Sequence, residues 1–218
     1  MRGRLLKSGE NLALLGLPFS FYKLSFCAMI YGNSVLFDAG ALQRQPEKPE
    51  TVIRMPVSAD GKSVWSLIGD TKTLDDNSLY CNLLQATHFA STCAIAEQGG
   101  EVVGWVSGYV PPEEPETLFI WQVCVSEVAR GQGLGRRLIG DVLARPGCRG
   151  IKALKCTITH DNEASWALFT SIARRLNAQL QQVELFEREL HFGGRHDSEY
   201  AVNIGPFRPD QVGALTSH

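Results

Sequence analysis

The chain has 218 residues, of which 44% are hydrophobic and 20% charged, and its formal net charge is −2. This length fits one domain, or one domain with an extension. No uninterrupted apolar run reaches the roughly 20 residues of a membrane-spanning helix, and the near-neutral charge gives no basic surface for nucleic acid. The composition therefore indicates an ordinary globular protein with neither a membrane nor a nucleic-acid partner.

The first 48 residues differ from the rest of the chain. They have a basic start and an apolar middle, as a signal peptide has, but Glu10 and Lys23 interrupt the apolar stretch and no cleavage site follows. Neither helical nor strand periodicity runs through them, and residues 43–50, QRQPEKPE, are typical of a polar linker. The expected organisation is a poorly ordered extension, a folded domain and a flexible tail, over residues 1–48, 49–207 and 208–218.

Strand and helix patterns alternate after this linker. Apolar runs and a glycine turn predict strands at 51–57, 92–97, 101–109, 117–125, 151–159, 183–190 and 200–207. Apolar residues at helical spacing predict helices over 60–70, 77–90, 134–144 and 161–176, and Asp60 and Asn77 are expected to cap the first two. The order predicts an α/β fold, a mixed sheet with helices on both faces.

The cysteines do not indicate a metal site. There are six, without a CxxC pair or histidine-rich spacing, and most lie in apolar runs. They are Cys27, Cys81, Cys93, Cys124, Cys148 and Cys156. We expect reduced thiols in a cytoplasmic protein that binds no metal.

A glycine-rich turn separates the strand at 117–125 from the helix that follows. Its residues 130–135 read RGQGLG. Bare backbone amides before a helix form an anion site, above all for phosphates. A P-loop would need Lys followed by Ser or Thr, and a dinucleotide fingerprint would need glycine where Arg136 stands, so neither fits.

The turn does match the pattern (Gln/Arg)-x-x-Gly-x-(Gly/Ala), and it resembles the pyrophosphate loop of the GNAT acetyltransferases. The resemblance implies the GNAT acyl-CoA N-acyltransferase fold over 49–207, with acetyl-CoA as co-substrate. It also implies that backbone amides in Val123–Val125 face the thioester oxygen and that Asn162 contacts the pantetheine arm or caps its helix. The implied cofactor residues are Val123, Val125, Arg130, Gly131, Gln132, Gly133, Leu134, Gly135, Arg136 and Asn162.

Four further segments narrow the resemblance. LDDNSLY, HFASTC, PPEEPETLFIWQVCV and TITHDNEAS, which all lie between residues 74 and 165, together resemble the diaminobutyrate acetyltransferases of ectoine biosynthesis. His160 stands where that family is expected to have proline. The resemblance implies acetylation of the 4-amino group of L-2,4-diaminobutyrate, a role in osmotic stress, and a homodimer.

Substrate residues follow from the same segments. Asp75 and Tyr80 are expected to bind the acceptor, although the first can also cap a helix and the second can belong to the core. Trp121 is expected to wall the pocket by a cation–π contact, and Cys124, three positions further along the same strand, is expected to line the acceptor site as well. His196 and Glu199 resemble a late segment that closes over the acceptor. Direct transfer requires no thiol nucleophile, so we do not expect Cys124 to carry the acetyl group.

The sequence does not identify the general acid or the general base. Phe169 stands where many members of this fold have a tyrosine general acid, and phenylalanine has no proton to donate. Glu199, His196 or a water relay remain alternatives for the base. An acetyltransferase for another amine, such as a polyamine, and a non-catalytic acetyl-CoA sensor are the alternative functions.

Overall fold

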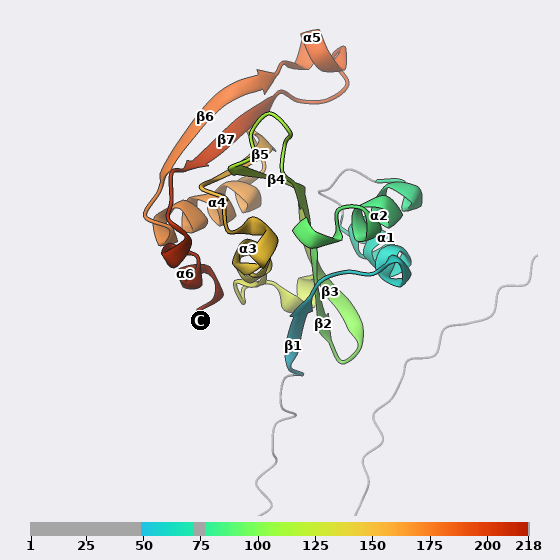
Figure 1. Ribbon diagram of the computed structural model, residues 1–218. Helices are drawn as coiled ribbons and strands as arrows, with labels where there is room; N and C mark the ends of the chain where they lie inside the picture. Colours follow the sequence, from blue (N-terminus) through green and yellow to red (C-terminus); the bar gives the residue numbers. More distant parts are fainter. Residues whose placement is uncertain (1–48, 72–76, 218) are drawn as a thin grey trace, which may run out of the picture. The chain divides into compact units, whose positions relative to one another are not determined.

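The computed structural model describes residues 49–71 and 77–217 (Figure 1). The extension expected over 1–48, and Asp75, lie outside the described residues. The strands are β1 (Thr51–Arg54), β2 (Ala94–Gln98), β3 (Glu101–Tyr109), β4 (Thr117–Val125), β5 (Ala153–Thr159), β6 (Gln179–Phe186) and β7 (Glu199–Gly205). The α-helices are α1 (Gly61–Gly69), α2 (Leu79–Thr87), α3 (Leu134–Ala144), α4 (Glu163–Arg175), α5 (Arg188–Phe192) and α6 (Gly213–Thr216). Short 3-10 helices are η1 (Ser58–Asp60), η2 (Ala90–Thr92), η3 (Glu127–Ala129), η4 (Pro146–Cys148) and η5 (Pro209–Gln211).

The strands form one mixed sheet in the order β1-β2-β3-β4-β5-β7-β6. Neighbours pair antiparallel except β4 and β5, which run parallel. Figure 1 shows α3, α4 and α6 on one side of the sheet and α1 with α2 on the other, and β6 and β7 continue past the other strands toward α5. The predicted α/β fold, a mixed sheet with helices on both faces, is confirmed.

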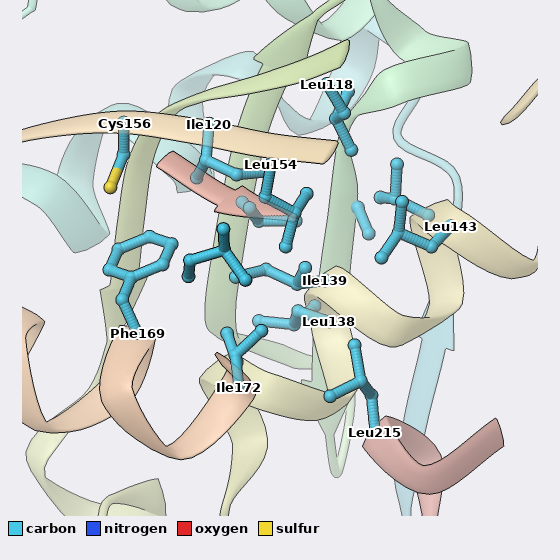
Figure 2. Packing of buried hydrophobic residues seen from close by; sticks show 14 of the residues in the cluster. Leu118, Ile120, Leu138, Ile139, Leu143, Leu154, Cys156, Phe169, Ile172 and Leu215 are labelled. Carbon is cyan, nitrogen blue, oxygen red and sulfur yellow. The ribbon is translucent and has the colours of Figure 1, made fainter. Parts of the chain in front are cut away.

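Each face of the sheet has its own core. The larger core joins α3, α4 and α6 to the sheet, with Leu138, Ile139 and Ile172 fully buried in it (Figure 2). The smaller core packs α1 against Trp105 and its neighbours on the opposite face. Complete burial of a Leu, Ile or Phe side chain stabilises the fold by about 1.5–3 kcal/mol, so the two cores fix the sheet between its helices.

Strand β4 carries an irregularity where the site is built. In the β3–β4 register Ser107 opposes Gln122 and Gly108 opposes Ile120, which leaves Trp121 as an extra residue, a β-bulge. Leu118 and Ile120, before the bulge, belong to the larger core, whereas Cys124, after it, belongs to the smaller one. The bulge therefore shifts the alternation of β4 by one residue and changes which side chains face each side.

The parallel ladder between β4 and β5 is short. It consists of three pairs: Thr117 with Ala153, Leu118 with Leu154, and Phe119 with Lys155. Beyond these pairs the described residues of β4 and β5 are not paired with each other. The remainder of β4 and β5 therefore diverges, and the gap between the two strands opens at their carboxyl ends.

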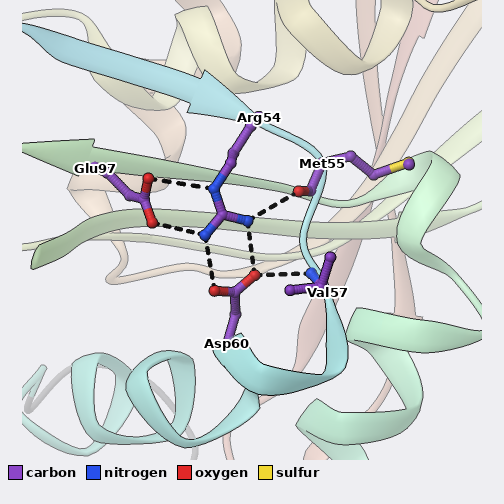
Figure 3. A network of polar contacts seen from close by, with 5 residues as sticks. All are labelled: Arg54, Met55, Val57, Asp60 and Glu97. Carbon is purple, nitrogen blue, oxygen red and sulfur yellow. Dashed lines mark hydrogen bonds and ion pairs between the residues drawn. The ribbon is translucent and has the colours of Figure 1, made fainter. Parts of the chain in front are cut away.

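Asp60 occupies the N-cap position of α1, as the sequence predicts, but its side chain makes no capping hydrogen bond to that helix. Its carboxylate accepts two hydrogen bonds of 2.8 Å from the Arg54 guanidinium and one of 2.7 Å from the Val57 amide (Figure 3). Arg54 also donates to Glu97 on β2, at 2.6 and 3.2 Å. The network thus joins β1 and β2 to the start of α1. Ser78, not Asn77, caps α2, by accepting from the Cys81 amide.

Replacement of Asp60 should show what this network contributes. The Arg54 guanidinium, through its hydrogen bonds, holds the pKa of Asp60 below its ordinary value of 3.8. Asp60→Asn should lower the free energy of unfolding at neutral pH by about 1–3 kcal/mol. A carboxyl group whose pKa is lowered in the folded protein stabilises the fold only while it is ionised. The difference in unfolding free energy between the wild type and Asp60→Asn should therefore vanish as the pH falls through the pKa of Asp60 in the folded protein. Urea titrations at several pH values measure this.

Asp210→Asn is the matched control, because Asp210 pairs with Arg208 at the exposed surface. It should leave the unfolding midpoint nearly unchanged. A loss for Asp60→Asn no larger than that of the control would contradict the role of the network.

The end of the chain is packed against the domain, where the sequence predicted a flexible tail over 208–218. Leu215 on α6 is fully buried, and a Cβ on Gly140 of α3 would come within 2.8 Å of its Cβ. The Arg136 guanidinium donates to the carbonyls of Ala214, Leu215 and Ser217. A buried leucine and a guanidinium anchor are the physical reason that residues 209–216 form η5 and α6.

Leu215→Ala should therefore cost about 2–5 kcal/mol of unfolding free energy, since it leaves a cavity in the larger core. Leu190→Ala is the control, because Leu190 is 73% exposed, and it should change stability by no more than about 0.5 kcal/mol. Denaturant unfolding of both variants measures the difference. Equal midpoints for the two variants would show that the C-terminal segment does not contribute to the core.

A membrane-crossing helix is not found over 49–71 and 77–217, where each helix is too short or too polar for that role.

Candidate functional site: two adjoining cavities at the β4–β5 gap

Two cavities open where β4 and β5 diverge. The first, the aromatic cavity, has a volume of about 510 Å³ and is lined by Trp121, by residues of β5 and by the start of β7. The second, the turn cavity, has a volume of about 380 Å³ and is lined by the glycine turn, the end of β4 and the start of α4. Val123, Asn162 and Ser165 line both. The two cavities therefore adjoin at these three residues.

The glycine turn has the backbone of an anion site. Gly131 and Gly133 lie in the left-handed region, with φ of +74° and +66°, which side chains rarely adopt. The first intrahelical bond of α3 runs from Arg137 N–H to Gly133 O, so the amides before it have no intrahelical acceptor. These amides lie at the positive end of the helix dipole, beside the turn cavity.

The third glycine has a packing role. A Cβ on Gly135 would lie 3.3 Å from Val123 and 3.4 Å from Leu168, so glycine lets α3 approach β4 and α4 closely. Other side chains hold the turn: Arg130 donates to Val125 O at 3.2 Å, and Gln132 donates to Val128 O at 3.3 Å. The turn is thus held by side-chain hydrogen bonds before α3 and by close packing within the first turn of α3.

Arg136 adds a buried positive charge to this cavity. Its side chain is bonded to the C-terminal carbonyls, and no carboxylate pairs with it among the described residues. Burial, together with Arg175 and Arg137, lowers its pKa. An anion in the turn cavity would compensate a charge that neutral carbonyls solvate only partly.

Aromatic rings surround the aromatic cavity. The ring centroid of Tyr109 lies 6.5 Å from Phe89, 5.2 Å from Phe119 and 6.3 Å from Trp121. Trp121 is half exposed because the bulge directs it out of the core, and it lines this cavity. Such faces attract a cationic group. The sequence did not single out Tyr109, Phe89 or Phe119, although Tyr109 ends an apolar strand two positions before a pair of prolines.

Tyr80 is not among the residues that line either cavity, and its role as a substrate residue stays a prediction. It lies in the first turn of α2 and is 69% exposed. Asn77, just before this helix, lines the aromatic cavity instead, and its Nδ2 donates to Gln122 Oε1 at 3.0 Å. This bond joins the start of α2 to the buried side of β4. The polarity of Gln122 in an apolar strand is the one local signal that points to it.

The late segment reaches the aromatic cavity. His196 and Glu199 both line it, although they lie 70 or more positions after Trp121 in the chain. Glu199 begins β7, where it is opposite Thr159 of β5 and Phe186 of β6. The Nδ1 atom of His196 is 2.7 Å from the Asp197 carbonyl oxygen. The structure thus brings together the two predicted late residues and Trp121.

The environment of Cys124 does not favour a role as the nucleophile that carries the acetyl group. It is buried in the smaller core, where its sulfur lies 3.2 Å from Thr71 Oγ1, and burial raises its pKa. A neutral, buried thiol is a poor nucleophile. Cys124 lines the turn cavity rather than the aromatic one, so the prediction that it contacts the acceptor has no geometric support. No cluster of metal-ligating side chains occurs within the described ranges.

The start of α4 lies between the cavities. Asn162 caps this helix, with its Oδ1 accepting from the Ser165 amide at 3.1 Å, and it lines both cavities. Phe169, seven residues further along, is buried in the larger core near Cys156 (Figure 2), and it lines the aromatic cavity. The start of α4 therefore lies where the turn cavity, a candidate anion site, adjoins the aromatic cavity, a candidate cation site.

This geometry agrees with the comparisons with known proteins. The model described as the acetyltransferase (GNAT) family matches residues 62–173. L-2,4-diaminobutyric acid acetyltransferase of Methylotuvimicrobium alcaliphilum is 45% identical over 164 residues, 75% of this chain and 95% of the relative. The chain belongs to the diaminobutyrate acetyltransferases of the GNAT family.

Two further relatives support this membership. The enzyme of the same name from Chromohalobacter salexigens is 49% identical over 166 residues, 76% of this chain and 86% of the relative. Diaminobutyrate acetyltransferase from Paenibacillus lautus, solved in complex with its substrate L-2,4-diaminobutyric acid and coenzyme A, superposes with a TM-score of 0.70 at 37% identity. That match covers 73% of this chain and 96% of the solved one.

The glycine turn gives a direct test. Gly131→Ala would meet no neighbouring atom, but it places a Cβ on a left-handed residue. Relief of that strain, about 1–2 kcal/mol, should pull the turn out of its anion-binding shape and weaken coenzyme A binding about tenfold. Calorimetry of coenzyme A binding measures this.

The control is Gly147→Ala, at a glycine with open space around it and an ordinary φ. Its dissociation constant should match that of the wild type. If both variants bind coenzyme A equally well, the turn does not hold the cofactor.

Proposed function

We propose that the protein transfers the acetyl group of acetyl-CoA to the 4-amino group of L-2,4-diaminobutyrate. The observation that carries the proposal is the contact between the two cavities. The glycine turn lines one cavity, aromatic rings with Glu199 line the other, and Val123 of β4 lies at their junction. An acceptor amine and a thioester that enter from opposite sides would meet there.

The turn cavity would take the pyrophosphate and pantetheine of the cofactor. Free amides at the start of α3 and the buried charge of Arg136 would bind phosphate oxygens, and Asn162 lies further along toward the junction. The side chain of Arg130 is held by the Val125 carbonyl, so its charge stays at the mouth of this cavity. The bound cofactor supplies an activated acetyl group.

The oxyanion would be stabilised by β4 itself. Backbone N–H groups alternate between the two edges of a strand, and after Phe119 the edge that faces away from β3 has lost β5 as its partner. Donors in the Val123–Val125 stretch therefore point into the gap. Preorganised donors of this kind stabilise the tetrahedral intermediate more than the ground state.

The aromatic cavity would select the acceptor. The rings of Trp121 and Tyr109 offer faces to an ammonium group, and Glu199 offers a negative charge. His196 and Glu199 are the imidazole and the carboxyl group that line this cavity, and groups of these two kinds serve as general bases. The amine proton would pass to one of them, directly or through water, before the nitrogen attacks the thioester.

The wider role is part of the same proposal. The product would enter ectoine biosynthesis during osmotic stress, and the protein would act as a cytoplasmic homodimer with no metal. The supporting argument is the family membership of the chain.

The proposal is tested by acetyl-CoA thiol release with diaminobutyrate, ornithine, lysine and putrescine as parallel acceptors, and by NMR of the product. We expect a strong preference for diaminobutyrate and acetylation at nitrogen 4. Equal rates across the panel, or acetylation at the 2-amino group, would contradict the proposed substrate or regiochemistry.

Trp121→Ala should raise the KM for diaminobutyrate about tenfold or more, because a cation–π contact in a partly desolvated site is worth about 1–2 kcal/mol. The KM for acetyl-CoA should stay within about twofold. Steady-state kinetics with each substrate varied in turn separates the two. Trp65→Ala, on α1 and equally exposed but outside both cavities, is the control. If both tryptophan variants behave alike, the aromatic cavity is not the acceptor site.

A further inference from the structure

A thiolate can leave unassisted, but a hydrogen-bond donor would speed its departure, and Phe169 provides none. When the C–S bond breaks, the electron pair remains on the sulfur of coenzyme A. Phe169 lines the aromatic cavity but has only a hydrocarbon side chain, and it is packed into the larger core. A hydrogen-bond donor for the sulfur would therefore lie elsewhere at the junction of the cavities.

Ser165 is the side-chain hydroxyl that lines both cavities, within the part of the chain that the structure describes. The other hydroxyl groups of the site line one cavity alone: Tyr109, Thr157 and Thr159 the aromatic cavity, and Thr71 the turn cavity. Thr71 is also engaged, because its hydroxyl donates to Leu67 O at 3.0 Å. A thioester that spans the junction would be within reach of Ser165 first.

The local structure leaves this hydroxyl available. Ser165 lies in the first turn of α4, half buried, one helical turn before Phe169 on the same face. Its backbone N–H, not its side chain, makes the capping bond to Asn162. Its Oγ makes no hydrogen bond to another described residue in the structure. The first turn of a 13-residue helix also favours a negative charge nearby.

We propose that Ser165 is a catalytic residue whose Oγ–H donates a hydrogen bond to the coenzyme A sulfur as the thiolate departs. The C–N bond forms, the C–S bond breaks, and coenzyme A leaves as the thiolate. The proton lost by the amine goes to Glu199, His196 or water, so Ser165 keeps its own proton and only shares it with sulfur. This inference rests on the proposed function, since it assumes that acetyl-CoA spans the two cavities.

Ser165→Ala removes the donor and keeps the backbone cap. Thr170→Ala is the matched control, because Thr170 lies exposed on the same helix outside both cavities. A hydrogen bond to a charged group is strong enough that Ser165→Ala should slow acetyl transfer in a single turnover about 10- to 100-fold. The KM for acetyl-CoA should change less than about twofold. The control should behave as the wild type.

A second measurement uses coenzyme A alone. The thiol of enzyme-bound coenzyme A is titrated through its ultraviolet thiolate absorbance. A donor to sulfur stabilises the thiolate, so its pKa in Ser165→Ala should lie about one unit or more above that in the wild type. Thr170→Ala should not move it.

The outcomes separate the two proposals. An unchanged transfer rate and an unchanged thiol pKa in Ser165→Ala would overturn the role of Ser165. A higher KM for acetyl-CoA at full transfer rate would also overturn it, because Ser165 would then hold only the pantetheine arm. Failure of the wild type to acetylate diaminobutyrate would overturn the proposed function instead, and the coenzyme A titration would still report on Ser165.

Discussion

The parallel ladder between β4 and β5 ends after Phe119 and Lys155, and the bulge at Trp121 follows directly on β4. Loss of pairing at this point frees backbone donors of β4 and opens a gap that both cavities use. The bulge turns Trp121 toward the acceptor side while Cys124 returns to the core. Two local departures from regular sheet geometry therefore create both cavities, in which we propose that the cofactor, the acceptor and the oxyanion are held.

The cofactor turn depends on contacts far along the chain. Arg136, the first residue after the RGQGLG motif, is held by carbonyls of the last residues, and Leu215 packs against Gly140 on the same helix. The C-terminal segment thus supports the helix that begins at the glycine turn. A buried guanidinium without a carboxylate also leaves positive charge beside the turn cavity, where a pyrophosphate would be its natural counter-ion.

The sequence predicts the order of the strands and helices and the glycine turn, because periodicity and glycine spacing are local properties. Trp121, His196 and Glu199 were placed through short family segments, and the fold brings them together. The aromatic ring of Tyr109 and the Asn77–Gln122 bond could not be predicted, since they depend on the β3–β4 register and on a helix start that lies 45 positions away. Tyr80 is exposed rather than part of the core, because helical spacing alone does not tell which face of α2 is buried, and its substrate role stays a prediction. The packed tail was missed for the same kind of reason: one leucine in a short polar segment gives no periodic signal.

The most direct test is a calorimetric titration with a bisubstrate ligand, in which the sulfur of coenzyme A is joined through an acetyl bridge to nitrogen 4 of diaminobutyrate. If the two cavities meet at the β4–β5 gap, both halves bind at once, and the ligand should bind about 100-fold or more tighter than coenzyme A. Its affinity should fall in both Gly131→Ala and Trp121→Ala, which alter one cavity each. A bisubstrate ligand that binds no more tightly than coenzyme A would contradict the account, because the acceptor and the thioester could not then meet across this junction.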